Sequence, residues 1–405
     1  MTEILFALVF LTGLTALLAW VLQKTRARLL PSRPVLLTLN GQRRIEGWSN
    51  EKLLDLLNGA GVPVPSGCAG QGTCGLCRVS EVTGTAGPLA TEAARLSPAD
   101  LRAGVRLACQ VTVRQDMTLT VPEDVLGSAS HACTVARITA LTPLIREIVL
   151  ALPDGATFDF RAGNFVQVTA PAYRRAYSEI DLPDDHRTEW QRLGILGLVA
   201  QSTVAVSRAY SVASRPEDKG FVVLNIRLAT PPPGSPDVPP GVVSSWLFGL
   251  KPGDLVEVAG PYGEFRVQDS DREMVFIGGG VGMAPLRAMI HEQLGLGTTR
   301  QISFWYGART HAELFYAGEF EALAAQHPNF RWIPALSQPA RDSGWHGATG
   351  FVHDVAYQAH LRDHPAPEEC EFYLCGPPLM IQAVRAMLED CGVEPEDIHN
   401  DDFGI

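Results

Sequence analysis

The sequence lacks a stretch rich in lysine and arginine of the kind that binds a nucleic-acid backbone. Its 405 residues contain 33 Lys and Arg against 44 Asp and Glu, a formal net charge of -11. Without a basic stripe nothing neutralises a row of phosphates, which argues against a general affinity for nucleic acid. A hydrophobic content of 46% argues against disorder for most of the chain. A chain of 405 residues with this hydrophobic content is long enough for two or three domains, each with its own core.

The sequence also lacks the even spread of cysteines that is typical of secreted, disulfide-bonded domains. Of its 8 cysteines, several crowd into residues 68–77 and the others are scattered. This distribution favours a reducing compartment.

The N-terminus lacks the features of a signal peptide, because "MTE" has no positive charge and no small-residue cleavage site precedes the basic cluster. Residues 4–22, "ILFALVFLTGLTALLAWVL", carry no charge, and as a helix they would cover about 28 Å, close to the hydrocarbon thickness of a membrane. We predict a transmembrane anchor at residues 1–23, with a signal peptide as the alternative. The basic residues that follow predict a cytoplasmic location for the rest of the chain. They are Lys24, Arg26, Arg28 and Arg33.

Three further domains are predicted. Residues 31–127 contain the strand "PVLLTLNG", a helix in "SNEKLLDLLNGAG" capped by Asn50, and a strand starting at "LACQVTV", and they end before the linker "GSAS". Residues 131–270 consist of short strands with turn signals, which indicates an antiparallel barrel or sandwich. In residues 271–405 strands alternate with helices, one of them in "AELFYAGEFEALAAQ", which predicts a parallel α/β sheet.

Three cysteines of the first of these domains are spaced C-x5-C-x2-C in a loop rich in glycine, and a fourth follows on a later strand. The four are Cys68, Cys74, Cys77 and Cys109. Four thiolates can hold either zinc or an iron–sulfur cluster, but three ligands from one loop favour the cluster. The loop resembles that of plant-type and adrenodoxin-type ferredoxins, which implies a β-grasp α+β domain with a [2Fe-2S] cluster. One more residue than in the plant loop separates the first two cysteines.

The string RAYS occurs twice, at residues 175–178 and 208–211. On a strand, an arginine and a tyrosine two residues apart share a face, which offers a cation for phosphates and a bed for a flat ring. The second copy precedes the apolar strand "FVVLNIRLAT" and is the flavin candidate. The first lies in a stretch without strand periodicity, and we assign it to an inserted surface segment, residues 171–207, that holds no cofactor.

These features resemble the ferredoxin-NADP reductase superfamily, which implies bound FAD. The resemblance places Arg208 on the flavin phosphates, Tyr210 on the isoalloxazine, and Ser211 near N5 as a catalytic residue. "GVVSSW" and "GPYGEF" match two further elements of the superfamily. They imply cofactor contacts at Gly241, Ser244, Ser245, Tyr262 and Gly263.

The stretch "MVFIGGGVGMAPLRAMI" predicts a strand, a glycine-rich turn that can approach a diphosphate, and a helix. It departs from G-x-G-x-x-G at Met283, and no acidic residue follows about 20 residues on. It resembles the superfamily's GGGxGxxP element, and "YLCGPPLM" resembles its CGPP element. The implied nicotinamide-dinucleotide contacts are Gly278, Gly279, Gly280, Gly282, Pro285, Cys375, Gly376 and Pro377.

The same resemblance implies two more catalytic residues. Cys375 would lie near the nicotinamide, although a buried strand cysteine is the alternative, and Phe403 in "DDFGI" would lie on the flavin. We expect NADH to be preferred over NADPH, because "THAELFY" after Arg309 supplies no second arginine for a 2'-phosphate.

NADH delivers two electrons and a [2Fe-2S] centre accepts one, so a flavin between them is chemically required. The anchor, the insertion, the C-x5-C loop and the "DDFGI" ending together resemble the F subunits of sodium-translocating NADH:quinone oxidoreductases. The resemblance implies an NADH dehydrogenase subunit in the bacterial inner membrane that passes electrons to other subunits of a quinone reductase. Nothing in the sequence resembles a sodium path or a quinone site. An anchored reductase for an oxygenase and a zinc- and flavin-binding sensor remain as alternatives.

Overall fold

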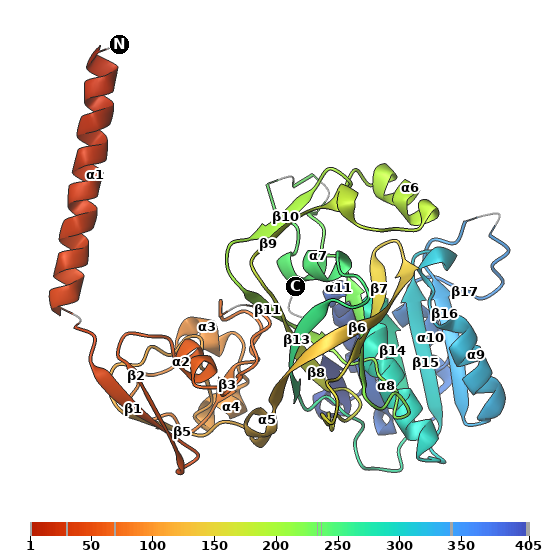
Figure 1. Cartoon of the computed structure of the whole chain (residues 1–405). Coiled ribbons are helices and arrows are strands. Elements are labelled where there is room, and N and C mark those ends of the chain that lie inside the picture. Colours follow the sequence, from red (N-terminus) through yellow and green to blue (C-terminus); the bar gives the residue numbers. More distant parts are fainter. Residues whose placement is uncertain are drawn as a thin grey trace. The chain divides into compact units, whose positions relative to one another are not determined.

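The computed structural model describes residues 2–29, 31–68, 70–232, 234–235, 237–340 and 343–401. The chain forms two compact units, whose elements are labelled in Figure 1. The first unit comprises Met1–Val64 and Gly70–Leu126, and the second comprises Pro65–Ala69 and Gly127–Ile405. The segment Pro65–Ala69 thus groups with the second unit, although the chain on either side of it belongs to the first.

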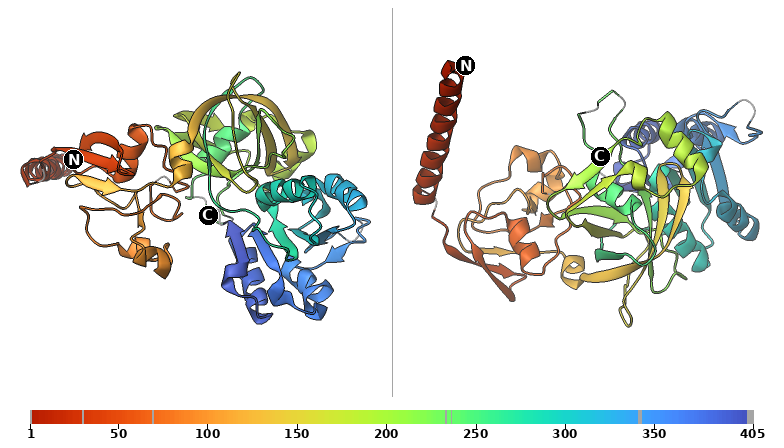
Figure 2. Two further views of the ribbon diagram at one scale, coloured as in Figure 1. Left: turned by 90° about the horizontal axis from the view of Figure 1, so that it is seen from below. Right: turned by 45° about the horizontal axis from the view of Figure 1, so that its top comes forward.

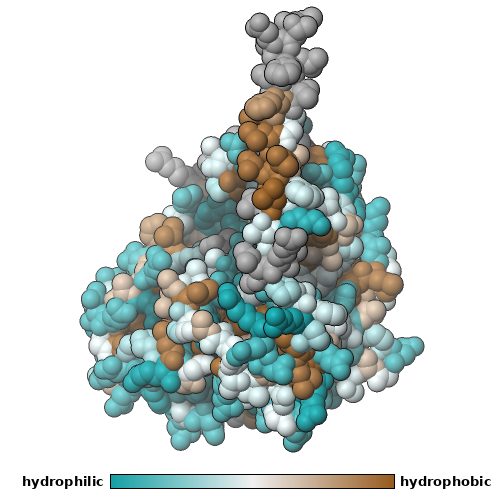
Figure 3. Space-filling view, turned by 90° about the vertical axis from the view of Figure 1, so that its left-hand side faces the viewer, coloured by the Kyte–Doolittle hydropathy of each residue, from teal (hydrophilic) through white to brown (hydrophobic). Residues whose placement is uncertain are grey.

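The predicted anchor lies within helix α1 (Thr2–Leu29). The side chains of residues 2–9, 22–23 and 26–29 lie outside the described part of the chain. Those of residues 10–21 are exposed, including Phe10, Leu14 and Trp20, and Figure 3 shows the apolar character of this part of the helix. Among the residues that the structure describes, no helix has both the length and the apolar content that crossing a membrane requires.

A small mixed sheet and a helix form the core of the first unit. Strand β1 pairs antiparallel with β2 and parallel with β5, and α2 buries its leucine side chains. The elements are β1 (Pro34–Leu39), β2 (Arg43–Trp48), α2 (Leu53–Gly59), β3 (Arg78–Val79), α3 (Ala90–Ala93), α4 (Pro98–Arg102), β4 (Arg106–Leu107), β5 (Met117–Leu119) and α5 (Glu123–Gly127).

The helix cap predicted at Asn50 is wrong. Helix α2 begins at Leu53, and Lys52 is the residue at its N-cap. Asn50 instead adopts a left-handed turn, with φ of 74°. Asparagine tolerates this conformation better than most residues do, so the side chain that suggested a cap serves the turn that precedes the helix.

The strand predicted at "LACQVTV" is also wrong beyond its first residue, because β4 ends at Leu107. The carbonyls of Ala108 and Val111 accept hydrogen bonds from the first backbone N–H groups of α2, at 3.2 and 3.0 Å. These carbonyls satisfy donors that a helix start leaves without intrahelical partners. Cys109 therefore lies in a turn and not on a strand.

An antiparallel barrel begins the second unit, as predicted. Six strands of the described chain pair in the order β11-β8-β13-β6-β7-β12, and a bridge between Val212 and Leu224 joins the edge strands. Strand β6 begins at Ala129, so the predicted linker "GSAS" is partly strand. The elements are β6 (Ala129–Thr142), β7 (Ile145–Ala151), β8 (Phe165–Ala170), β11 (Val206–Ser211), β12 (Phe221–Arg227), α7 (Val242–Phe248) and β13 (Leu255–Tyr262).

The insertion, residues 171–207, is more than the surface segment that we predicted. Tyr177, in the first RAYS copy, and Trp190 are fully buried, and their rings lie 5.4 Å apart. Trp190 also stacks on Phe248 of α7 at 6.2 Å and donates from Nε1 to the carbonyl of Pro143 at 2.7 Å. The prediction failed because these partners are distant in sequence. The elements of the insertion are β9 (Tyr173–Ala176), η1 (Tyr177–Glu179), α6 (Asp184–Arg192) and β10 (Val199–Ser202).

A parallel sheet completes the second unit and confirms the α/β prediction. Its strands run in the order β17-β16-β15-β14-β18-β19, with α8 and α9 packed on one face and α10 and α11 on the other, as Figure 2 shows. The strands are β14 (Met274–Gly279), β15 (Ile302–Ala308), β16 (Phe330–Leu336), β17 (Ala348–Thr349), β18 (Glu371–Cys375) and β19 (Ile398–Asp401). The helices are α8 (Met283–Gly295), α9 (Ala317–Gln326), α10 (Val352–Ala359) and α11 (Pro378–Asp390).

The helix predicted in "AELFYAGEFEALAAQ" is shorter than expected. Helix α9 begins at Ala317, directly after Tyr316, which has a left-handed backbone with φ of 59°. Residues other than glycine rarely adopt this conformation. Tyr316 Oη donates to Glu147 Oε2 at 2.6 Å, a contact with the barrel that the local sequence does not reveal.

Candidate functional site

The glycine turn, residues 279–282, joins β14 to α8. A Cβ on Gly282 would lie 1.9 Å from the carbonyl oxygen of Cys375, so only glycine fits at this crossing. Tyr306 Oη donates to the carbonyl of Gly280 at 2.9 Å. A Cβ on Gly280 would meet nothing within 4 Å, so space is open over the turn. That space, together with the start of a 13-residue helix, suits a diphosphate.

The CGPP motif lies against this turn. Gly278 and Cys375 are partners in the parallel register of β14 and β18. A Cβ on Gly376 would lie 3.0 Å from the carbonyl oxygen of Gly279. Pro377 is the N-cap residue of α11, and Pro285 is buried in the first turn of α8. The structure therefore brings the two predicted nucleotide motifs together.

The second RAYS copy lies on β11, confirming the predicted strand. Arg208 and Tyr210 are half-buried and Ser211 is buried. Burial raises the pKa of the Tyr210 phenol, with Arg208 acting in the opposite direction, so the hydroxyl stays protonated. Tyr262 is buried at the end of β13. Gly263 follows with φ of 95°, where a Cβ would lie 2.8 Å from the Phe165 ring.

Two of the three predicted catalytic residues, Ser211 and Cys375, have Asp401 as a common neighbour. Ser211 Oγ donates to Asp401 Oδ2 at 2.9 Å, and Asp401 is the register partner of Cys375 on the neighbouring strand. Sequence reasoning missed Asp401, although it opens the "DDFGI" ending from which Phe403 was chosen. Phe403 lies outside the described residues.

The serines of α7 are engaged within the protein. Ser245 is fully buried, and its Oγ donates to the carbonyl of Gly241 at 2.6 Å. Since this uses its one hydrogen, Tyr177 Oη must donate to Ser245 Oγ, at 2.7 Å. Ser244 Oγ accepts from the backbone N–H of Ala229 at 3.2 Å. Contact of these residues with a cofactor stays a prediction.

The glycines of the cysteine loop have left-handed backbones. Gly70, Gly72 and Gly75 have φ of 82°, 79° and 72°. A Cβ on Gly70 would lie 3.8 Å from Cβ of Cys109, and one on Gly72 would lie 2.6 Å from Nε2 of Gln110. Glycine lets the backbone wrap closely here, which fits a loop that encloses a cluster.

The four predicted ligand thiols differ in exposure. Those of Cys68, Cys77 and Cys109 are buried, and that of Cys74 is half-buried. A hydrogen bond with Cys109 and burial raise the pKa of the Cys77 thiol. Gln110 Nε2 donates to Cys109 Sγ at 3.4 Å, and such N–H donors also stabilise cluster sulfurs.

A buried ion pair lies close in sequence to Cys109. Glu92 is fully buried, and its carboxylate accepts hydrogen bonds from Arg106 Nε and Nη2 at 2.9 and 2.7 Å. The backbone N–H groups of Leu89 and Leu107 also donate to it. Burial favours the neutral acid, but these hydrogen bonds outweigh it and hold the pKa of Glu92 below its ordinary value.

Glu273, His360 and His364 have the spacing of a metal site, with ligand atoms within 4.8 Å of one another. Their hydrogen bonds argue against that use. His364 Nδ1 accepts from the backbone N–H of Ala366 at 3.2 Å, and His360 Nδ1 faces Arg331 Nη2 at 3.3 Å. Each ring then keeps its proton on Nε2 and donates to Glu273, at 2.8 and 3.3 Å. A histidine that binds a metal through Nε2 normally carries its proton on Nδ1 and donates it to an acceptor. The two rings here have the opposite protonation, so we assign no metal to these residues.

Arg309 is paired with a carboxylate. Its Nε donates to Glu313 Oε1 at 2.8 Å, and its backbone N–H donates to Glu313 Oε2 at 3.0 Å. The guanidinium is therefore already neutralised, which disfavours capture of a 2'-phosphate.

Family models match three parts of the chain. A 2Fe-2S iron-sulfur cluster binding domain matches residues 37–114, an oxidoreductase FAD-binding domain matches residues 195–267, and an oxidoreductase NAD-binding domain matches residues 276–386. Among solved structures, the Amycolatopsis cytochrome P450 reductase GcoB is similar, with a TM-score of 0.64 and 27% identity over 91% of this chain and 98% of that one. The ferredoxin reductase in carbazole 1,9a-dioxygenase has a similar fold, with a TM-score of 0.60 and 24% identity over 92% of this chain and 99% of that one.

Fold and site together define a multidomain oxidoreductase of the ferredoxin-reductase type with iron–sulfur, FAD and NAD domains. Comparison with full-length relatives identifies the family within this class of oxidoreductases. The F subunit of the Na(+)-translocating NADH-quinone reductase of Neisseria meningitidis is 45% identical over 403 residues, covering 99% of this chain and 100% of the relative. The corresponding F subunit of Pseudomonas paraeruginosa is 46% identical over 403 residues, covering 99% of each. The chain belongs to the family of F subunits of Na(+)-translocating NADH-quinone reductases, which confirms the resemblance noted from the sequence.

Proposed function

We propose that this chain is the electron-input subunit of a Na+-translocating NADH–quinone reductase. It takes hydride from NADH onto FAD and passes single electrons through a [2Fe-2S] cluster to other subunits. The convergence of Ser211, Asp401 and Cys375 at the glycine turn carries this proposal. It brings the flavin motif and the nicotinamide motif to one place.

FAD, when bound, accepts a hydride and releases electrons one at a time. In our proposal Arg208 would hold its phosphates and Tyr210 would pack against its ring. Ser211 can hold a proton at Oγ, where Asp401 accepts its hydrogen bond at 2.9 Å. Cys375, buried at the end of β18, orients the nicotinamide.

The other predicted contacts remain part of the proposal. The glycine turn and Pro285 would hold the dinucleotide diphosphate, and Phe403 would contact the flavin. The cluster ligands are Cys68, Cys74, Cys77 and Cys109, whose soft thiolates suit iron. The proposed domains are the ferredoxin-type domain at 31–127, the FAD domain at 131–270 and the NADH domain at 271–405.

We also propose that residues 1–23 anchor the chain in the bacterial inner membrane. Residues 4–22 carry no charge, and the apolar side chains described on α1 are exposed. We propose that the remaining domains lie on the cytoplasmic side, because basic residues follow the apolar stretch. Sodium transport and quinone reduction then belong to partner subunits.

An EPR spectrum of the purified full chain before and after anaerobic NADH addition tests the proposal, with iron, sulfide and flavin measured on the same sample. We expect one FAD and two irons per chain, and an EPR signal from the reduced cluster after NADH. Zinc in place of iron, or a flavin that NADH reduces without an EPR signal, would contradict it. An oxygenase reductase, the alternative that the fold also allows, would not purify from membranes with other quinone-reductase subunits.

A further inference from the structure

Arg287 of α8 links the two halves of the second unit. It is only 4% exposed, and its Nη1 donates to the carbonyl of Ala213 at 2.7 Å. Ala213 lies two residues after Ser211, at the end of the strand with the flavin motif. Arg287 lies one helical turn after Met283, the first residue of α8. One guanidinium therefore joins α8, the helix that starts at the glycine turn, to the segment directly after β11.

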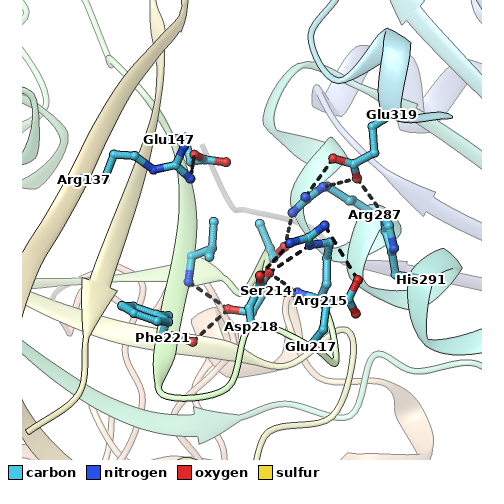
Figure 4. Close-up of polar contacts among 12 residues, drawn as sticks. Arg137, Glu147, Ser214, Arg215, Glu217, Asp218, Phe221, Arg287, His291 and Glu319 are labelled. Carbon is cyan, nitrogen blue, oxygen red and sulfur yellow. Dashed lines mark hydrogen bonds and ion pairs between the residues drawn. The ribbon is translucent and has the colours of Figure 1, made fainter. Parts of the chain in front are cut away.

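The remaining donors of Arg287 fix its orientation (Figure 4). Its Nε and Nη2 donate to the two carboxylate oxygens of Glu319 on α9, at 2.6 and 2.9 Å. Such a two-point contact defines both direction and distance. His291 Nε2 lies 2.6 Å from Glu319 Oε1, and the guanidinium lies 4.4 Å from the ring centre of Tyr316. The Arg287 guanidinium is thus fixed by hydrogen bonds to Ala213 and Glu319 and by its contact with the Tyr316 ring.

Tyr316, which lies beside the Arg287 guanidinium, makes a second contact with the barrel. Tyr316 Oη donates to Glu147 Oε2 on β7 at 2.6 Å and accepts from Asn225 Nδ2 on β12 at 2.9 Å. A small apolar cluster lies between the two halves, made of Val149, Ala213, Val223 and Ala284. Ala284 belongs to the first turn of α8, so apolar and polar contacts meet beside the glycine turn.

We propose that Arg287, Glu319, His291, Tyr316 and Glu147, here called the Arg287 network, set the separation between the glycine turn and β11. Arg287 is then a positioning residue for hydride transfer. The hydride transfer in this inference rests on the proposed function. The separation between the glycine turn and β11 rests on the hydrogen bonds described above. The reaction moves one hydride from NADH to the flavin and leaves NAD+, and Arg287 takes no part in the transfer. A displacement of about 1 Å in such a site can lower the rate about 100-fold.

Stability alone does not account for this arrangement. Buried ion pairs often contribute little net stability compared with apolar side chains of the same size. Here the ion pair lies beside the apolar cluster between the two halves, next to the glycine turn. A test must therefore separate positioning from folding.

Arg287→Lys in the full chain is the main variant, because lysine keeps the charge but loses the two-point contact. Arg300→Lys is the matched control. Arg300 is also buried and paired with a glutamate, Glu371, at 2.6 Å, but it lies away from β11 and the glycine turn. Tyr316→Phe is a milder second variant that keeps the ring and removes only the hydrogen bonds of the hydroxyl.

The first measurement is hydrogen exchange of the flavin-free chain. We expect faster exchange in residues 280–287 and 213–214 for Arg287→Lys than for Arg300→Lys. The second is flavin reduction by stopped flow. At saturating NADH we expect the rate to fall about 100-fold for Arg287→Lys and about tenfold for Tyr316→Phe, with NADH dissociation constants within about threefold of wild type. The isotope effect with 4-deuterated NADH should increase, because hydride transfer becomes more strongly rate-limiting.

A flavin-reduction rate within threefold of wild type in folded Arg287→Lys would overturn the proposal. Unchanged exchange beside the glycine turn would overturn it as well, whatever the activity. If Arg287→Lys fails to fold, Tyr316→Phe decides by the same two measurements. If the wild-type flavin is not reduced by NADH, the proposed function fails, while the exchange comparison still tests the geometry.

Discussion

Gly282→Ala should separate the glycine turn from Cys375. The added Cβ would lie 1.9 Å from the Cys375 carbonyl oxygen and 2.2 Å from its carbon. Carbon and oxygen in contact normally keep about 3.3 Å apart, so the backbone must retreat by about 1.4 Å. Neither neighbour is the end of a flexible side chain that could move aside.

The expected result is a loss of hydride transfer larger than the loss of stability. Overpacking of this kind costs about 1–3 kcal/mol of unfolding free energy. A shift of more than about 1 Å at a reacting centre can lower the rate about 100-fold. Stopped-flow reduction of bound flavin by NADH measures the rate, and dithionite reduction of the same sample shows that flavin and cluster remain competent.

Gly295→Ala is the matched control, because a Cβ there would meet nothing within 4 Å at the last residue of the same helix. We expect wild-type rates and equal or slightly higher stability. If Gly282→Ala, folded and with full flavin content, reduced its flavin within threefold of the wild-type rate, the close crossing would not matter for the reaction. The reasoning from the glycine geometry would then be refuted.

Three further predictions follow from described contacts. Glu313→Gln frees Arg309 from a carboxylate and should raise the kcat/KM ratio of NADPH to NADH about fivefold, an effect of about 1 kcal/mol; an unchanged ratio would exclude Arg309 from cofactor choice. Tyr177→Phe removes the donor to Ser245 Oγ and should lower the free energy of urea unfolding by about 1 kcal/mol. An unchanged free energy of unfolding would mean that this hydrogen bond does not stabilise the fold. Glu92→Gln breaks a buried ion pair and should cost about 3–5 kcal/mol. Because the folded-state pKa of Glu92 is lowered, its contribution is complete above its ordinary pKa and is lost as the pH falls through the folded value, so acid titrations of melting temperature should be flatter in the variant.

Periodic features were predictable from the sequence. The alternation of strands and helices after residue 271 predicts the parallel sheet, because buried parallel strands and their crossover helices produce that pattern. The glycine turn was predictable because close backbone contacts favour glycine, whereas the CGPP motif was noted only from the family resemblance.

Contacts between distant residues were not predictable. The two RAYS copies are identical, yet Tyr177 is fully buried against Trp190, which stacks in turn on Phe248, while Tyr210 is only half-buried on its strand. The predicted helix starts late, after Tyr316, whose side chain reaches Glu147, far back in the chain. Tertiary contacts of this kind override local propensity.

The hydrogen bond from Ser211 to Asp401 has a consequence for biosynthesis. Its partners are 190 positions apart, so this contact between the barrel and the last strand of the parallel sheet cannot form while the ribosome is still translating that interval. The cysteine-bearing segments emerge long before then. Nascent chains usually fold one domain at a time from the N-terminus, which leaves a period in which iron can be delivered before the contact between Ser211 and Asp401 exists.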